Sequence, residues 1–95
     1  MECVTKKIVE KYGDKQIVIA IEELSELTKE LCKAYRGQAN IQNLIEEIAD
    51  CYIVLEEMKQ FFKITPEQVG NQINVKLQRT KDRYIGEDDE ICEKR

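Results

Sequence analysis

The fold is decided by residues 14–36, which read DKQIVIAIEELSELTKELCKAYR. Large apolar side chains recur in this stretch at steps of three, four or seven residues, which is the period of an amphipathic helix. They are Ile17, Ile21, Leu24, Leu27, Leu31 and Tyr35. Asp14 stands where an N-cap residue is expected, and Gly37 stands where a helix stops. We therefore predict one long helix from Asp14 to about Arg36.

The same period resumes in residues 40–62, which read NIQNLIEEIADCYIVLEEMKQFF. Asn40 is expected to cap this helix, whose apolar residues are Leu44, Ile48, Tyr52, Leu55, Met58 and Phe62. Because only a few residues connect the two long helices, they should pack as an antiparallel hairpin.

Shorter helical patterns flank the hairpin. Residues 4–12 predict a short helix that ends at Gly13. Residues 65–68, Thr-Pro-Glu-Gln, combine a capping box with a proline suited to the first helical position, and so predict a fourth helix that fades near Tyr84. The highly charged residues 87–95 are expected to form a mobile tail.

These patterns predict an all-α protein with a single domain over residues 1–95. Residues 17–21 and 52–55 are apolar all the way round the helix, which is unusual for a helix that faces solvent on one side. We expect a second subunit to cover them, so that a four-helix-bundle core is completed by oligomerisation, as a homodimer or a homotetramer.

Composition excludes several classes of function. The 95 residues include 19 acids, 15 bases and no histidine, so a Ser-His-Asp nucleophile and a His₃ or Cys₂His₂ zinc site cannot form. The net charge of −4 argues against binding a nucleic acid polymer, and the longest apolar run is too short to span a membrane. The four cysteines form no CxxC pair and no apolar leader is seen, which favours reduced thiols and a cytoplasmic protein.

The informative residues are carboxylates in two matched motifs, Glu-Glu-x-x-Glu (Glu22, Glu23, Glu26) and Glu-x-x-Asp (Glu47, Asp50). Residues three apart lie on one face of a helix, and the hairpin can bring the two pairs to a similar height. Converging carboxylates repel one another unless a hard cation binds them, and Mg²⁺ prefers such oxygen ligands, with Mn²⁺ as the alternative ion.

An isolated Glu-x-x-Glu match is most often the solvated face of a helix, and we interpret Glu56-Glu57 as such a surface pair. The two acidic motifs differ from an isolated match in their context, since both flank the most apolar stretches and precede a basic segment. In that segment Lys76, Arg79 and Arg83 recur at steps of three and four, so they line one helix face. Beside a metal site, such a face suits phosphate oxygens.

With twenty residues between Glu26 and Glu47, the double motif resembles the signature of the all-α nucleoside triphosphate pyrophosphatases. This superfamily includes MazG-like proteins, dimeric dUTPases, dCTP pyrophosphatases and phosphoribosyl-ATP pyrophosphatases. The resemblance covers roughly residues 14–85. It implies an all-α bundle built across subunits, Mg²⁺ dependence, and cleavage of a nucleoside triphosphate between its α- and β-phosphates.

Carried over by position, the resemblance makes Glu23, Glu26, Glu47 and Asp50 the metal ligands, and either Glu22 or Glu46 the group that orients the attacking water. Lys76 and Arg83 match the phosphate-facing positions, with Arg79 beside them. Tyr12, Tyr35 and Tyr52 are candidates for stacking on the base, although core or surface packing is the better explanation of each. Two alternatives stay open: a non-catalytic helical interaction or regulatory module, and a phosphoribosyl-ATP pyrophosphatase with one dedicated substrate.

Overall fold

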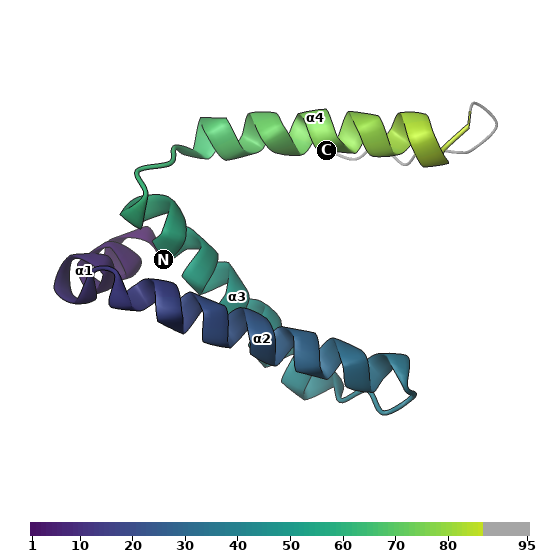
Figure 1. The fold of residues 1–95 in the computed structure, drawn as a ribbon, viewed down its shortest axis with the longest axis horizontal. Helices are drawn as coiled ribbons and strands as arrows, with labels where there is room; N and C mark the ends of the chain where they lie inside the picture. The colour runs from purple at the N-terminus through teal and green to yellow at the C-terminus, as the bar shows by residue number, and fades with distance from the viewer. Residues whose placement is uncertain (87–95) are drawn as a thin grey trace. The chain divides into compact units, whose positions relative to one another are not determined.

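The computed structural model describes residues 1–86, and these form four α-helices with no strand among them (Figure 1). The helices are α1 (Glu2–Tyr12), α2 (Lys15–Tyr35), α3 (Ile41–Phe61) and α4 (Pro66–Tyr84). The all-α prediction is confirmed, and the expected tail at 87–95 lies outside the described residues. Across the described part of the chain, no helix is long and apolar enough to cross a bilayer.

The chain divides into two compact units, and each is described by itself. The first unit runs from Met1 to Ile64 and contains α1, α2 and α3. The second unit begins at Thr65, and its described part consists of Thr65, α4 and the two residues after α4.

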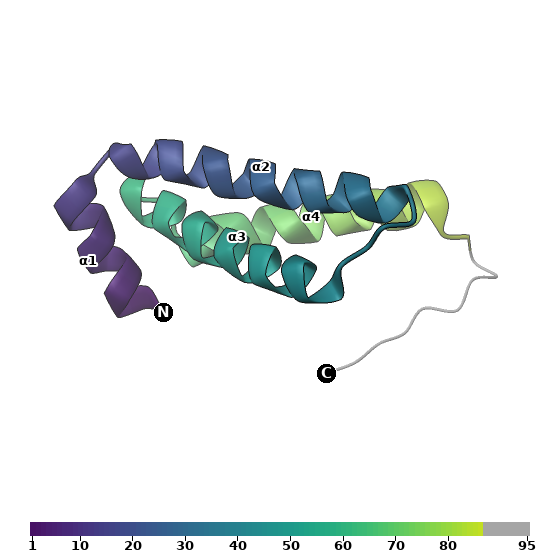
Figure 2. The same ribbon diagram turned by 90° about the horizontal axis from the view of Figure 1, so that it is seen from below.

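Helices α2 and α3 form the predicted antiparallel hairpin (Figures 1 and 2). Two contacts set their register. The amide of Gln16 donates a hydrogen bond to Glu57 Oε1 at 2.9 Å, and Cys51 Sγ lies 3.6 Å from the carbonyl oxygen of Glu23. These contacts are about two helical turns apart on each helix, so the two helices stay in regular register between them.

The predicted N-caps have different outcomes. Asn40 caps α3, because its side chain accepts a hydrogen bond from the Asn43 N–H at 3.0 Å. The capping box at Thr65 and Gln68 is also confirmed, with both reciprocal hydrogen bonds present. Asp14 occupies the predicted N-cap position of α2, but its backbone is already in the right-handed helical region and its side chain makes no capping bond. Capping by a side chain requires an extended backbone at that position.

Both helices of the hairpin end in the same kind of turn. After α2, the N–H of Gln38 bonds to the Lys33 carbonyl oxygen at 2.9 Å, and Gly37 takes a φ of +84°. After α3, the N–H of Ile64 bonds to the Lys59 carbonyl oxygen at 2.8 Å, and Lys63 takes a φ of +58°. Both are Schellman turns, which need a left-handed residue just past the helix.

Helix α1 packs mainly against α3 (Figure 2). Thr5 is the buried residue of α1, and the Gln60 amide nitrogen of α3 lies 2.9 Å from its hydroxyl oxygen. The same nitrogen donates to the carbonyl oxygen of Glu2 at 3.2 Å. Polar contacts, as well as apolar packing, therefore hold α1 in place.

The surface of α2 that faces α3 contains many polar residues. We call this surface, with its counterpart on α3, the seam. Its α2 residues are buried or half-buried and recur at steps of three and four: Gln16, Ala20, Glu23, Leu27, Glu30 and Ala34. Among the described residues, the buried apolar residues are Ala20, Cys51 and Val54.

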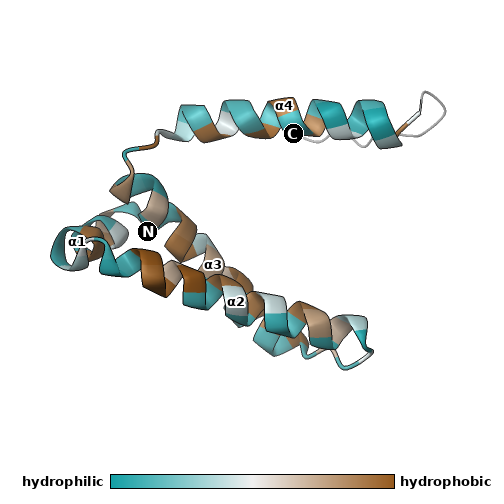
Figure 3. Cartoon of the chain, viewed as in Figure 1, coloured by the Kyte–Doolittle hydropathy of each residue, from teal (hydrophilic) through white to brown (hydrophobic). Residues whose placement is uncertain are grey.

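The apolar stripe predicted for α2 lies beside the seam and is largely exposed; Ile21, for example, is 61% exposed. In each helix of the hairpin, one set of exposed apolar residues stands one position after the residues of the seam, which on α3 include Leu44, Glu47, Cys51 and Val54. Because the two helices are right-handed and antiparallel, these positions project to the same side of the hairpin. We call this surface the apolar face; it comprises Ile21, Leu24, Leu31 and Tyr35 of α2 with Ile45, Ile48, Tyr52 and Leu55 of α3. In Figure 3 the apolar residues are densest in the first half of α2 and the middle of α3.

Candidate metal centre

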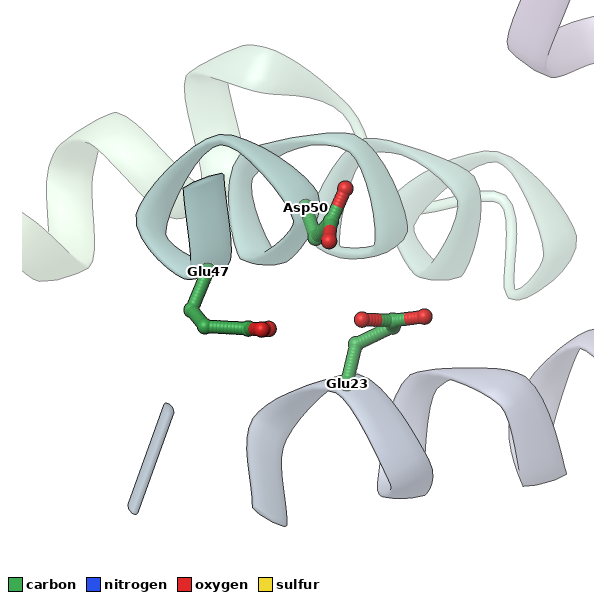
Figure 4. Close-up of side chains that lie close together, drawn as sticks. All are labelled: Glu23, Glu47 and Asp50. Carbon is green, nitrogen blue, oxygen red and sulfur yellow. The ribbon is translucent and has the colours of Figure 1, made fainter. Parts of the chain in front are cut away.

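Three of the four predicted metal ligands meet in the seam. Glu23 projects from α2, and Glu47 and Asp50 project from α3, so that one carboxylate oxygen of each lies within 4.8 Å of the others. All three side chains are half-buried. Figure 4 shows them directed into the space between the two helices. The geometry therefore concentrates negative charge at one point of the hairpin.

The local sequence explains this meeting. Glu47 and Asp50 are three residues apart on α3, so they share the face that packs against α2. Glu23 sits at the matching height, because the contact between Cys51 and the Glu23 carbonyl oxygen places residues 50 and 51 opposite it. The cap at Asn40 fixes where α3 begins, and so fixes the height of the acidic pair.

The clustering changes the acidity of the carboxyl groups. The pKa of Glu23 is raised by burial, then by the charges of Asp50 and Glu47, with a side-chain hydrogen bond to Asp50 adding to the effect. Burial also raises the pKa of Glu47, and Asp50 again contributes the largest charge effect. Both shifts mean that the ionised cluster is under electrostatic strain when no cation is bound.

Glu26, the fourth predicted ligand, is not among the three carboxylates that meet. Its side chain is 48% exposed and forms an ion pair with Lys29 at 3.6 Å. Its charge nevertheless contributes to the raised pKa of both Glu23 and Glu47. Glu26 therefore borders the cluster, and its role as a direct ligand stays a prediction.

Glu22 and Glu46, the candidates for orienting water, are both exposed. Glu46 accepts a hydrogen bond from the Gln42 amide at 3.1 Å. Each immediately precedes a member of the cluster in sequence, on α2 and α3 respectively. The structure does not favour one over the other.

The predicted phosphate-binding residues Lys76, Arg79 and Arg83 are all exposed on α4, in the second unit. Their spacing places them along one face of that helix, as expected. The Arg83 guanidinium lies over the ring of Tyr84, 5.9 Å from its centroid. The candidate base-stacking residues Tyr12, Tyr35 and Tyr52 are all exposed in the first unit.

Two buried carboxylates in the seam were not expected from the sequence. Glu57, interpreted as part of a surface pair, is only 5% exposed, and that interpretation is wrong. Glu30 is also buried, and its charge contributes to the raised pKa of Glu47. A signal for Glu30 was present, because it follows Glu23 by seven residues and therefore returns to the same face of the helix.

The ligand chemistry of the site favours a hard cation. The three converging groups are all carboxylates, which suit Mg²⁺ or Mn²⁺. Cys51 adjoins the cluster, but burial and the charge of Glu23 raise the pKa of its thiol. A protonated thiol is a poor metal ligand, so the carboxylates are the better candidates.

Comparison with known proteins gave no match, whether to a protein family, to a curated protein sequence or to a solved structure. The fold and site define a class in structural terms alone: an all-helical hairpin protein with a three-carboxylate cluster in its seam. The resemblance to the all-α pyrophosphatases rests on the two acidic motifs and stays a prediction.

Proposed function

We propose that the protein is a Mg²⁺-dependent nucleoside triphosphate pyrophosphohydrolase, which cleaves its substrate between the α- and β-phosphates to give a nucleoside monophosphate and pyrophosphate. The observation that carries the proposal is the convergence of Glu23, Glu47 and Asp50 from two helices. These three residues come from the two acidic motifs, which resemble the metal-binding motifs of the all-α pyrophosphatases. Glu26 completes the proposed ligand set.

The proposed reaction needs three tasks from the chain. A bound Mg²⁺ would neutralise part of the negative charge of the triphosphate and would lower the pKa of a bound water. Glu23, Glu47 and Asp50 would hold the ion, and Glu22 or Glu46 accepts the proton of the attacking water as its oxygen bonds to the α-phosphorus. Lys76, Arg79 and Arg83 offset charge on the pyrophosphate, which leaves as the phosphoanhydride bond breaks.

A homo-oligomer, dimer or tetramer, is part of the proposal. The apolar face of the hairpin supports it, because large apolar side chains such as Tyr52, 68% exposed, lie together on one side. Continuous apolar surface of this kind marks an interface more often than it marks a free surface. A second hairpin packed on this face would complete a four-helix bundle.

Light scattering coupled to size-exclusion chromatography tests the oligomer. Ile48→Glu places a charge within the apolar face and should shift the protein toward a monomer. Lys29→Glu changes charge on the opposite side of the hairpin, and should leave the mass unchanged. A wild-type mass equal to that of one chain would overturn this part of the proposal.

The apolar face also favours a second candidate, a non-catalytic helical module that binds another protein. A pyrophosphate-release assay separates the two functions. The wild-type protein should release pyrophosphate from at least one nucleoside triphosphate in Mg²⁺ and none in EDTA. Release from phosphoribosyl-ATP alone would instead identify the dedicated biosynthetic enzyme, and release from no substrate would favour the non-catalytic module.

We also propose a cytoplasmic location and action on free nucleotides without a nucleic acid polymer as partner. The free thiols of Cys3, Cys32 and Cys51 support a reducing compartment. Selective loss of function on reduction of the purified protein would contradict this, since reduced thiols are expected to be its working state.

A further inference from the structure

Glu30 is a buried carboxylate that the proposed ligand set does not use. Its side chain is only 9% exposed, and its Oε2 pairs with Lys33 Nζ at 3.4 Å. Its other oxygen, Oε1, is shielded from solvent and has no hydrogen-bond partner. Leaving a buried carboxylate oxygen without a donor is costly, so such an atom calls for a partner.

Glu47 carries a second oxygen of the same kind. Its Oε1 is also shielded from solvent and without a hydrogen-bond partner. Two acceptors without a donor therefore occur in the same seam, one on each helix. Neither can satisfy the other while both carboxylates are ionised, because each can only accept.

The register of the hairpin brings these two groups near one another. Glu23 lies opposite residues 50 and 51, and α3 runs antiparallel to α2. Moving along α2 from Glu23 toward Glu30 therefore moves back along α3 from Asp50 toward Glu47. Glu47 thus lies at a height between Glu23 and Glu30, which explains why the charge of Glu30 affects the pKa of Glu47.

We propose that Glu30 is a positioning residue of the metal site, which accepts a hydrogen bond from a water in the hydration shell of the cation held by Glu23, Glu47 and Asp50. This inference rests on the proposed function, and it adds a residue outside the acidic motifs. Mg²⁺ retains several of its waters when it binds to proteins. Such a water can donate one of its hydrogens to Glu30 Oε1.

The role has a consequence for cation affinity. Groups that hydrogen-bond to a metal's ligands or waters typically change affinity by about 10–100-fold when they are replaced. Glu30→Gln keeps the size of the side chain but removes its charge and one acceptor oxygen. We therefore expect Mn²⁺, used as the probe, to bind this variant about 10-fold or more weakly than it binds the wild type.

A matched control is present in the same seam. Glu57 is a buried glutamate like Glu30, but its Oε1 is already satisfied by the Gln16 amide. Glu57→Gln should leave Mn²⁺ affinity unchanged. Calorimetric titration with Mn²⁺ and the rise in melting temperature on adding Mn²⁺ should give the same ranking: wild type equal to Glu57→Gln, and both above Glu30→Gln.

The outcomes separate this inference from the proposed function. If the wild type binds no Mn²⁺, the metal site itself is absent. If the wild type binds Mn²⁺ and Glu23→Gln abolishes binding, while Glu30→Gln binds as tightly as the wild type, only the role of Glu30 is overturned. Should Glu30→Gln fail to fold, Glu30→Asp keeps the charge but retracts the carboxylate by one methylene, and an unchanged Mn²⁺ affinity in that variant overturns the inference equally.

Discussion

Two carboxylate sites, one buried and one half-buried, lie in the same seam between α2 and α3, and they are built in opposite ways. At one end, Glu57 is paired with the Gln16 amide, so an acceptor meets a donor. Toward the middle, Glu23, Glu47 and Asp50 face one another, so acceptors meet acceptors. The first site is complete within the chain, whereas at the second site a bound cation would offset the repulsion between the carboxylates. Burial of an acid is therefore not by itself a sign of a binding site.

The largest expected effect is on activity at the middle site. Glu47→Gln and Asp50→Asn each remove a proposed metal ligand, so pyrophosphate release should fall by at least about 10²–10³-fold. Far-ultraviolet circular dichroism should show unchanged helical content. Glu57→Gln, on the same helix, should retain the wild-type rate once its folding is verified. Wild-type rates in Glu47→Gln would remove the distinction between the two sites.

The second prediction concerns stability at the paired site. Gln16→Leu removes the donor and leaves Glu57 buried without a partner, which should lower the free energy of unfolding by about 1–3 kcal/mol. Urea denaturation should show the same loss with Mg²⁺ and with EDTA, because this site binds no ion. By contrast, Glu47→Gln should stabilise the metal-free protein, since it removes a repelling charge. Destabilisation of equal size by both substitutions would contradict the comparison.

The third and smallest effect is a dependence on pH. Folding raises the pKa of Glu23 and Glu47 above the ordinary glutamate value of about 4.3. Between the unfolded and folded pKa values the native state holds more protons, so its stability falls as the pH rises through that window. In thermal melts of the metal-free protein, the melting temperature should therefore fall more from pH 4 toward neutrality in the wild type than in Glu47→Gln. Added Mg²⁺ should reduce this difference, and identical pH profiles would argue against the strained cluster.

The helices and their ends were predictable because they depend on neighbours in sequence. The spacing of apolar residues predicts the long helices, and the cap at Asn40 and the box at Thr65 and Gln68 follow from local side-chain chemistry. Asp14 lies at the predicted N-cap position, but it makes no side-chain capping bond because its backbone is already helical.

The rotation of each helix about its axis was less predictable, because it depends on the partner helix. The rule that residues three apart share a face groups Glu23 with Glu26, but the seam runs through Glu23 and leaves Glu26 half-exposed. Burial of Glu57 depends on Gln16, which is 41 residues away in sequence. No local pattern carries such a pairing.

The two Schellman turns of the hairpin differ in the residue that adopts the left-handed conformation. Glycine adopts this conformation at no steric cost, whereas for lysine the conformation costs about 1 kcal/mol of free energy. The end of α3, at Lys63, should therefore open more often than the end of α2, at Gly37. Native-state hydrogen exchange would register this as faster exchange of the Ile64 amide than of the Gln38 amide, so the hairpin would fray from one end first.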